Sequence, residues 1–420
     1  MNQFESSHAR NQYEIGAADI SAIVQTVRDH KRFAFLVVRG DRGELQIVVD
    51  KSKLEIPPVG SFVRIQGDIV SSEKANSGIE MQCSSIALTS KPAALPPFPL
   101  DKPIEASLDL VLDLRAVSLR NNYSDAVFRC QSAIGNAFRD QLHYEGFIEI
   151  HSPKLVGGGT EGGADVFKVA YFDREASLAQ SPQLYKQIAC GAFGKVYEVG
   201  PVFRAENSNT SRHLTEFTGL DFETTLHRYQ HSLMDIEERF LGRALKYLSL
   251  FQRERQLLGF DIPSEVQIPR ISWQEANQLV EKHGTSTPDQ THDKAIGQAA
   301  KLEFGSRFLF VYGYPEDEKP FYVMPSSEPG FTESFDFLVD GLEVSSGGER
   351  INDLALLEER MKAKGLAPEQ YPGYLSAFKY GMPKHGGAGL GLERVTQCLL
   401  GLHNVRESTL FVRDPRRLDP

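Results

Sequence analysis

The first ninety residues alternate short apolar runs with turn residues. The runs are AIVQTV, RFAFLVVRG, ELQIVVD, SFVRIQGDIV and GIEMQCSSIALT. The stretches GDRGE, IPPVG and NSG separate them, and they are rich in residues that favour tight turns. About five strands packed this closely leave no room for long helices, which predicts a small closed barrel. The OB-fold is the leading candidate, and a structural barrel that binds nothing is the alternative.

The pattern changes near residue 100. KPAALPPFPLDKP, residues 91–103, carries five prolines, which exclude a regular helix or a central strand and predict a semi-rigid linker. AVFRCQSAIGNAFRDQLHYEG, residues 126–146, has apolar residues at helical spacing and ends at a glycine. HSLMDIEERFLGRALKYLSLFQRE, residues 231–254, predicts one long amphipathic helix.

Several later segments predict strands. FIEIHSPKL is closed by Pro153, KVYEVGPVFRAE and TGLDFETT follow, and FDFLVDGLEVSSGG predicts two strands around a turn at Asp340 and Gly341. GLGLERVTQCLLGL predicts a strand that enters a helix. Helices and mostly antiparallel strands are mixed, without βαβ alternation and without GxGxxG. The pattern predicts an α+β fold and disfavours a doubly wound nucleotide fold.

Composition narrows the class of protein only a little. The 420 residues are 41% apolar with a formal charge of −10, which is typical of a soluble globular protein of two or three domains. An acidic total still permits a local basic surface for nucleic acid. The four cysteines are scattered without a CxxC motif, which favours a reducing compartment over a zinc site or a disulfide framework. No apolar leader and no run of about 18 apolar residues occurs, so we expect a cytoplasmic protein without a membrane segment.

Both signs of charge crowd into VFRAENSNTSRHLTEFTGLDFE, residues 202–223. A strand, a polar loop and a second strand would form a hairpin with Arg204 near the end of the first strand and Asp221 on the second. Arg212 and His213 would then lie at its tip. The alternative is a solvated hairpin whose surface ion pairs contribute about 0–1 kcal/mol each. The functional interpretation gains weight because FDFLVDGLE and GLGLERV repeat the pattern of a charge inside an apolar strand or at a helix start.

Asp336 and Glu343 lie on opposite sides of the predicted turn, so the hairpin would bring two carboxylates together. Such a pair raises one pKa unless a cation lies between the two groups, and Mg²⁺ is commonly held by carboxylates together with substrate phosphates. Arg394 follows the glycine-rich run GGAGLGLE. Together with Arg204, these residues indicate a nucleoside triphosphate whose charge is stabilised during displacement.

The same residues carry a resemblance to a known family. FRAENSNTSRHLTEFTGLDFE, GAGLGLERV and GFIEIHSPKL resemble the second, third and first signature motifs of class II aminoacyl-tRNA synthetases. TEGGADVF, QSPQLYKQ, SFDFLVDGLEVSSGGERI and FKYGMPKHGG resemble the short, archaeal and eukaryotic kind of aspartyl-tRNA synthetase, across essentially the whole chain. The resemblance implies an OB-fold anticodon-binding domain over residues 1–100, a hinge over 101–118, and a catalytic domain over 119–420. That domain would hold an antiparallel sheet flanked by helices, and the first motif would build a homodimer interface.

The resemblance also implies a role for individual residues. Arg204 and Arg394 are the expected catalytic residues, on the α- and γ-phosphates of ATP. The expected ATP-binding set is Arg204, Glu206, Arg212, His213, Glu343 and Arg394, and Mg²⁺ is expected on Asp336 and Glu343. Lys186 and Arg350 are expected to grip the side-chain carboxylate of aspartate. Glu161, Gln183 and Asp221 are expected near the ammonium group. The role of His385 stays open, since it can simply satisfy backbone groups in a turn.

In the barrel, Phe35 and Gln46 match an aromatic that stacks on an anticodon base and an amide that contacts a base edge. This is how single-stranded RNA loops are usually bound. The alternative for Phe35 is a core position. Many short-type enzymes that accept only the aspartate tRNA carry a bulky aromatic near Gln25 and a basic residue near Asn76. Both differ here, so charging of tRNA(Asn) besides tRNA(Asp) stays open.

The implied activity is a two-step ligase reaction. The α-carboxylate of aspartate attacks the α-phosphate of ATP and releases pyrophosphate, and the aspartyl group then moves to the terminal ribose of tRNA. An asparaginyl-tRNA synthetase is the first alternative, disfavoured because Lys186 is a poor partner for an uncharged amide. The others are a synthetase-like RNA-binding protein without catalysis, and a paralogue that aspartylates a small molecule other than tRNA.

Overall fold

The computed structural model describes residues 13–75, 77–157, 166–208, 210–226, 231–263, 266, 268–287 and 291–419. The chain forms two compact units that meet in sequence between Ala126 and Val127. Among the described residues, no helix is long and apolar enough to cross a bilayer. Expected site residue Glu161 and the position of Asn76 lie outside the described residues.

The first unit contains a closed five-stranded barrel in the order β1-β2-β3-β5-β4, which confirms the prediction. Its strands are β1 (Gly16–Asp29), β2 (Phe33–Gly40), β3 (Gly43–Asp50), β4 (Phe62–Ser71) and β5 (Ile79–Ser90). Neighbours pair antiparallel except β3 and β5, which run parallel. Alternate residues point inward, so that Leu36, Val38, Leu45 and Ile47 are buried together in the barrel core.

Residues 91–103 form neither helix nor strand, as their prolines predict. Three helices follow: α2 (Leu108–Asp113), α3 (Arg115–Ser118) and α4 (Asn122–Tyr144). Ser107 begins α2 by accepting a hydrogen bond from the backbone N–H of Leu110. The helix predicted over 126–146 corresponds to α4, which starts four residues earlier and ends at Tyr144. Gly146 follows two residues later with a φ of 81°, a conformation that favours glycine.

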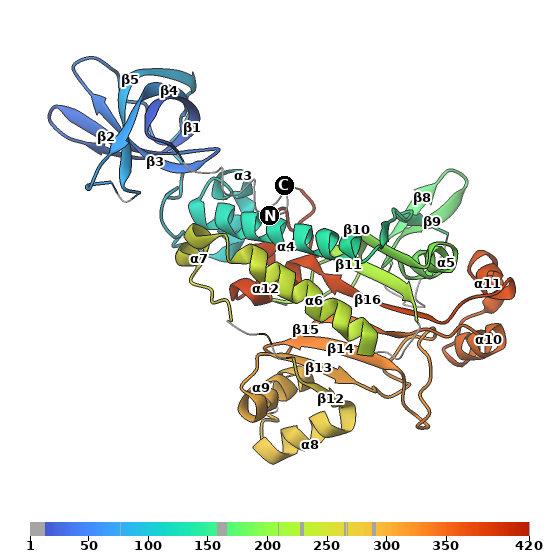
Figure 1. Ribbon diagram of the computed structural model, residues 1–420. Helices are drawn as coiled ribbons and strands as arrows, with labels where there is room; N and C mark the ends of the chain where they lie inside the picture. The colour runs from blue at the N-terminus through green and yellow to red at the C-terminus, as the bar shows by residue number, and fades with distance from the viewer. Residues whose placement is uncertain are drawn as a thin grey trace. The chain divides into compact units, whose positions relative to one another are not determined.

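The second unit is built on an eight-stranded sheet in the order β12-β13-β14-β15-β16-β11-β10-β6 (Figure 1). Its strands are β6 (Ile148–Glu149), β10 (Lys195–Phe203), β11 (Glu216–Thr225), β12 (Arg270–Ser272), β13 (Phe308–Tyr312), β14 (Ser334–Val339), β15 (Leu342–Glu349) and β16 (His385–Gly391). Only β6–β10 and β12–β13 are parallel. The strand predicted over FIEIHSPKL is only two residues long. A smaller sheet, in the order β7-β9-β8, contains β7 (Leu155–Val156), β8 (Lys168–Tyr171) and β9 (Arg174–Leu178).

The hairpin of β14 and β15 turns at Asp340 and Gly341, as predicted. Both have positive φ, 50° and 73°, which matches the right-handed twist of a two-residue hairpin turn. The register shifts beyond Phe337, so that Glu343 pairs with Leu338 while Ser346 pairs with Asp336. Paired residues share a face, and so do Asp336 and Leu338, which are two residues apart, so Asp336 and Glu343 lie on one face of the sheet. The register shift brings Ser346 to the same face in place of Ser345.

Helices surround the large sheet, and α6 (His231–Leu248) and α12 (Leu392–Leu400) pack against it. The single helix predicted over 231–254 is wrong: α6 ends at Leu248 and α7 (Gln252–Leu258) begins after a turn. Phe251 is buried at this turn, and its backbone N–H bonds to Leu248 O three residues back, which ends the α-helical path.

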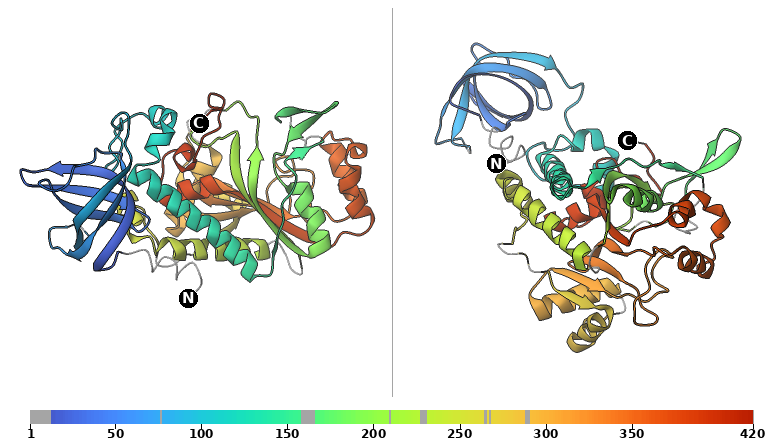
Figure 2. Two further views of the ribbon diagram at one scale, coloured as in Figure 1. Left: turned by 90° about the horizontal axis from the view of Figure 1, so that it is seen from above. Right: turned by 45° about the vertical axis from the view of Figure 1, so that its right-hand side comes forward.

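The remaining helices form two groups. α8 (Trp273–His283) and α9 (His292–Phe304) share a core with β12 and β13, and Figure 2 shows them, in yellow and gold, as one group at that edge of the sheet. α5 (Gln183–Phe193), α10 (Leu354–Ala363) and α11 (Pro372–Lys379) share another core through Leu184, Met361 and Phe378. Short 3₁₀ helices are η1 (Pro368–Gln370) and η2 (Val405–Ser408).

Candidate active site

A cleft of about 1250 Å³, including the solvent in its mouth, opens beside β11, β15 and β16 in the second unit. Most of the expected site residues line it: Gln183, Lys186, Arg204, Glu206, Arg212, His213, Asp221, Glu343, Arg350 and Arg394. Asp336 lines an adjoining cavity instead, and Glu343 lines both. Segments as distant in sequence as 183 and 394 therefore meet around one space.

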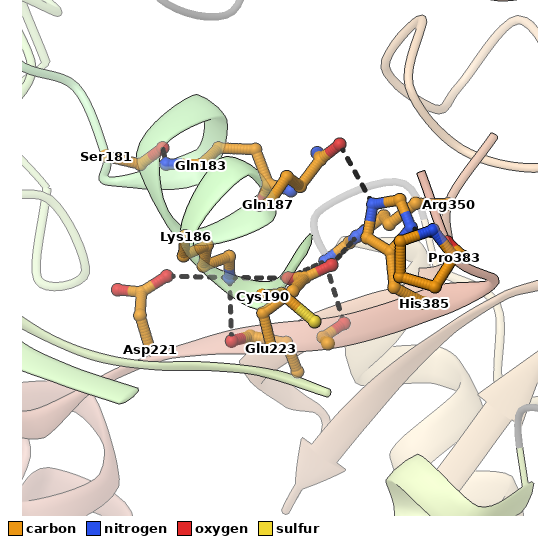
Figure 3. Close-up of polar contacts among 12 residues, drawn as sticks. Ser181, Gln183, Lys186, Gln187, Cys190, Asp221, Glu223, Arg350, Pro383 and His385 are labelled. Carbon is orange, nitrogen blue, oxygen red and sulfur yellow. Dashed lines mark hydrogen bonds and ion pairs between the residues drawn. The ribbon is translucent and has the colours of Figure 1, made fainter. Parts of the chain in front are cut away.

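At one end of the cleft, two cations and two carboxylates form a buried cluster (Figure 3). Lys186, on α5, places Nζ 3.0 Å from Asp221 Oδ1 and 3.6 Å from Glu223 Oε2. It also donates to the carbonyl oxygen of Ala388 at 3.0 Å. Arg350 donates through Nε to Glu223 Oε1 at 2.9 Å. We call Lys186, Asp221, Glu223 and Arg350 the ionic cluster; a buried carboxylate is stable there because its partners are charged and close.

Glu223 was missed as a site residue by the sequence reasoning, although its side chain is fully buried at the centre of the ionic cluster. Burial opposes its charge, but Arg350 and Lys186 hold the pKa of Glu223 below its usual value. A signal was present, because Asp221 and Glu223 are two residues apart on a strand and therefore share a face. Gly387 on the neighbouring strand makes the arrangement possible, since a Cβ there would collide with Phe222 O and the Glu223 side chain.

A layer of polar residues lies behind the ionic cluster. The Tyr374 hydroxyl donates to Gln187 Oε1 at 2.8 Å, and Nε2 of His385 lies 3.3 Å from the same oxygen. His385 Nδ1 donates to Pro383 O at 2.8 Å, and burial lowers the pKa of His385. The bond to Pro383 O agrees with one role that the sequence left open for His385, which is to satisfy backbone groups in a turn. Gln183, by contrast, turns toward the cleft from the first turn of α5.

The other end of the cleft is basic. Arg394, in the first turn of α12, donates to Glu343 O at 2.8 Å and to Arg212 O at 3.3 Å. Arg204 follows the end of β10, and its guanidinium lies 5.6 Å from the centre of the Phe217 ring. Arg204, Arg212 and Arg394 all line the cleft, and a cleft lined by several arginines can stabilise a polyanion.

The loop residues Arg212 and His213 do not form a free tip. Both are half-buried in the wall of the cleft. Burial lowers the pKa of His213, Glu206 opposes this from 4.0 Å, and the charge of Arg394 adds to the lowering. His213 Nδ1 lies 2.6 Å from the hydroxyl of Thr210, which fixes the ring. The cleft thus includes the loop residues, while the ion pair of His213 with Glu206 keeps both side chains partly exposed, so the solvated alternative for this hairpin stays open.

Asp336 and Glu343 are the carboxylates expected to hold Mg²⁺. Burial, together with the charge of Asp336, raises the pKa of Glu343 to about 7, against the opposing charges of Arg394 and Lys319. A buried carboxylate beside a second carboxylate is costly to ionise, and a bound cation would relieve that cost. No set of three His, Cys, Asp or Glu side chains in the described part of the chain is arranged to hold a metal alone. A pair of carboxylates completed by phosphate oxygens is a usual Mg²⁺ environment, so the donors fit that ion.

Lys319 was also missed, and no pattern in the sequence indicated it. It lies between β13 and β14, and its Nζ donates to Asp336 Oδ1 at 2.7 Å and to Oδ2 at 2.8 Å. The same nitrogen lies 3.9 Å above the centre of the Tyr314 ring. Lys319 therefore lies against the carboxylate pair in the space between the cleft and the adjoining cavity, both of which it lines.

In the barrel, Phe35 and Gln46 share the outer face of β2 and β3. Phe35 is half-buried, while its neighbours Ala34 and Leu36 point into the core, so the core alternative is wrong. Gln46 donates to Glu80 Oε2 at 2.9 Å. Gln25 is buried, and its Nε2 donates to Asn122 Oδ1 at 2.6 Å, so this amide contacts protein.

Comparison with known proteins defines the class. The family model of class II tRNA synthetases (D, K and N) matches residues 107–415, and the OB-fold nucleic acid binding domain matches residues 19–89. The chain therefore belongs to the class II aminoacyl-tRNA synthetases. Both matches also confirm the predicted α+β architecture with an N-terminal OB-fold.

Within that class the chain belongs to the aspartate–tRNA ligases. It is 43% identical to the aspartate–tRNA(Asp/Asn) ligase of Thermus thermophilus, with 94% of each chain covered. It is 39% identical to the aspartate–tRNA(Asp/Asn) ligase of Archaeoglobus fulgidus, covering 94% of this chain and 95% of that one. The aspartate–tRNA(Asp) ligase of Thermoplasma acidophilum is 38% identical, with 94% and 95% covered.

Solved structures show the same architecture. The asparaginyl-tRNA synthetase of Pyrococcus horikoshii, complexed with asparaginyl-adenylate, matches with a TM-score of 0.87 at 31% identity and 97% coverage of both chains. A putative aspartyl-tRNA synthetase from Leishmania major matches with a TM-score of 0.85 at 30% identity, covering 99% and 94%. Aspartyl and asparaginyl enzymes thus share this fold, so the fold alone does not identify the substrate amino acid. The side chains of the cleft must distinguish the two amino acids.

Proposed function

We propose that this chain activates L-aspartate with ATP to give aspartyl-adenylate and transfers the aspartyl group to tRNA. One observation carries the choice of amino acid. The cleft has a buried ionic cluster with Lys186 and Arg350 at one end, and Arg204 and Arg394 at the other. An amino acid with an anionic side chain fits the first end, and a nucleoside triphosphate fits the second.

Charge balance separates aspartate from asparagine. The ionic cluster contains two cations and two carboxylates. Aspartate adds a side-chain carboxylate, for Lys186 and Arg350, and an ammonium group, for Asp221, so the cluster stays neutral. Asparagine adds only the ammonium group and directs NH₂ donors at cationic donors. A site built for hydrogen bonding rejects a partner of the wrong kind by up to about 10⁴–10⁵-fold.

The chemical step needs no protein nucleophile. We assign Arg204 to the substrate α-carboxylate and the ATP α-phosphate, and Arg212, His213 and Arg394 to the γ-phosphate, with Glu206 beside them. Holding the carboxylate and phosphate together makes the attack effectively intramolecular, and the arginines stabilise charge that develops on the phosphate. Asp336 and Glu343 would hold Mg²⁺ with the phosphate oxygens, and the ion would neutralise part of the triphosphate charge.

The barrel supports tRNA as the acceptor. We propose residues 1–100 as the anticodon-binding domain, 101–118 as the hinge and 119–420 as the catalytic domain. Phe35 on the outer face can stack on a base, and the neighbouring Gln46 offers an amide. We propose tRNA(Asp) and tRNA(Asn) as acceptors, because the bulky aromatic is replaced by Gln25 and two relatives are named Asp/Asn ligases.

A homodimer in the cytoplasm is the proposed working form. Tyr144, Ile148 and Leu155, in and around the first signature motif, are about half exposed or more, and exposed apolar side chains grouped in one segment mark interaction surfaces. All four cysteines are free thiols, which suits a reducing compartment. Ile148→Asp should convert the dimer into a folded monomer in analytical ultracentrifugation. A wild-type protein that sediments as a monomer at micromolar concentration would contradict the dimer.

The test of the function is ATP–pyrophosphate exchange with each of the twenty amino acids, followed by charging of purified aspartate and asparagine tRNAs. We expect exchange with aspartate alone and charging of both tRNAs. Exchange that depends on asparagine would instead identify an asparaginyl enzyme. The absence of exchange with any amino acid would identify a synthetase-like protein without catalysis, and exchange without charging of either tRNA would point to another acceptor.

A further inference from the structure

Lys319 occupies the position where a cation is needed in the carboxylate pair. Its ammonium contacts both oxygens of Asp336, at 2.7 and 2.8 Å, and lies 3.5 Å from Ser346 Oγ. The side chains of Lys319 and Asp336 are each only 9% exposed. An ammonium that bridges both oxygens of a nearly buried carboxylate is a strong, charge-assisted contact. Lys319 thus supplies positive charge to Asp336 from within the chain.

The surroundings explain why a cation is held here. Asp336, Glu343, Asp293 and Glu318 all line the adjoining cavity that Lys319 also lines, and Asp336 is the carboxylate that its ammonium contacts. The Tyr314 ring, 3.9 Å from Nζ, adds a cation–π contact on a further side.

A divalent ion and Lys319 cannot use Asp336 in the same way. Mg²⁺ binds carboxylate oxygens at about 2.0–2.1 Å, and both Asp336 oxygens already accept from Nζ. An ion on either oxygen would place two cations within a few ångströms of each other, with repulsion weakly screened in a nearly buried site. The ammonium therefore has to leave Asp336. Lys319 also lines the main cleft, where the nucleotide phosphates are proposed to bind. Its ammonium can therefore contact those phosphates once it has left Asp336.

We propose that Lys319 is an internal counter-cation that occupies Asp336 until a nucleotide-borne divalent ion displaces it toward the phosphates, and that it thereby makes metal binding depend on nucleotide. This inference rests on the proposed ATP-dependent function and concerns the metal step alone. Lys319 is a positioning residue in this scheme: it holds the Asp336 side chain in place, and it suppresses binding of a divalent ion that arrives without ATP.

The test measures Mn²⁺ affinity by electron paramagnetic resonance, with Mn²⁺ alone and with Mn²⁺ plus a non-hydrolysable ATP analogue. Lys319→Met should bind Mn²⁺ alone at least about tenfold more tightly than wild type, because a neighbouring opposite charge lowers the affinity of a carboxylate for a proton by about 10–10³-fold and opposes a metal ion by the same electrostatic repulsion. The enhancement by the analogue should shrink by a similar factor. Lys319→Gln provides the same comparison if the methionine variant does not fold.

The matched control is Lys294→Met, which removes an exposed lysine on α9 next to Asp293. It should leave Mn²⁺ affinity unchanged. Unchanged or weaker Mn²⁺ binding in the Lys319 variants would overturn the proposal, and so would equal tightening in Lys294→Met, since the effect would then be general charge. The experiment contains neither aspartate nor tRNA. Its result therefore does not depend on whether the proposed ligase activity is found.

Discussion

Arg350 Nε lies 2.9 Å from Glu223 Oε1, and both side chains are at most 4% exposed. Arg350 lines the end of the cleft where we propose that aspartate binds, and Lys186 adds a second cation 3.6 Å from Glu223. Removing one partner of a buried pair leaves an uncompensated charge, which costs about 3–5 kcal/mol. Glu223 therefore holds in place both cations that we propose to recognise aspartate, Lys186 and Arg350.

Glu223→Gln should weaken aspartate activation and also change acid stability. Its lowered pKa means that the folded protein favours the ionised form, so its contribution is complete above the ordinary value of 4.5 and is lost as the pH falls through the folded pKa. We expect a lower free energy of unfolding at pH 7 and a shallower decline below pH 4.5 than in wild type. Urea unfolding at several pH values measures both, and parallel profiles would show that Glu223 carries no such contribution.

Glu237 should have the opposite pH dependence. It is buried on α6 and accepts a hydrogen bond from Ser345 Oγ at 2.5 Å. Burial raises its pKa to about 8, against the Ser345 bond, and the charge of Asp336 adds to the rise. The folded protein thus keeps a proton that the unfolded chain releases, and stability falls as the pH rises from about 4.5 to 8.

Glu237→Gln should remove that decline, so that the variant gains stability relative to wild type as the pH rises, each pKa unit being worth about 1.4 kcal/mol. The comparison is urea unfolding at pH 5 and pH 8.5. Glu281→Gln, at an exposed position on α8, is the control and should follow wild type. A Glu237→Gln profile parallel to wild type would mean that this carboxyl titrates alike in both states.

Two neighbouring residues on β2 should separate RNA binding from folding. Phe35→Ala should leave aspartate-dependent exchange unchanged and lower the kcat/KM of tRNA charging, since one stacking platform is worth about 1–3 kcal/mol. Leu36→Ala, which empties a fully buried core position, should destabilise the barrel by about 2–5 kcal/mol. If Phe35→Ala charges tRNA at the wild-type rate and only lowers the melting temperature, the ring is structural.

Local patterns predicted the barrel and the β14–β15 hairpin because alternation and an Asp-Gly turn act within a few residues. They failed between Ser249 and Phe251, where the helical pattern continues but a buried phenylalanine ends the helix. They also predicted a longer strand over FIEIHSPKL, whereas β6 has two residues, Ile148 and Glu149, which pair with β10.

Sequence reasoning and the family resemblance placed Lys186, Asp221 and Arg350 in one site, and the structure brings them together. Glu223 was within reach of strand alternation but resembled an ordinary buried acid. Lys319 could not be predicted in this way, because its contact with Asp336 depends on the path of an irregular segment between two strands, which no periodicity describes.

The preference for aspartate over asparagine is the most direct test of recognition by the ionic cluster. Lys186→Leu removes one cation of the ionic cluster without touching the phosphate end, while Lys384→Leu, at an exposed position, is the control. In pyrophosphate exchange, wild type and the control should strongly prefer aspartate. Lys186→Leu should lose at least about a hundredfold in kcat/KM for aspartate, with little change in the KM for ATP, and its preference should fall toward unity. Full retention of the aspartate preference in Lys186→Leu would contradict recognition by the ionic cluster.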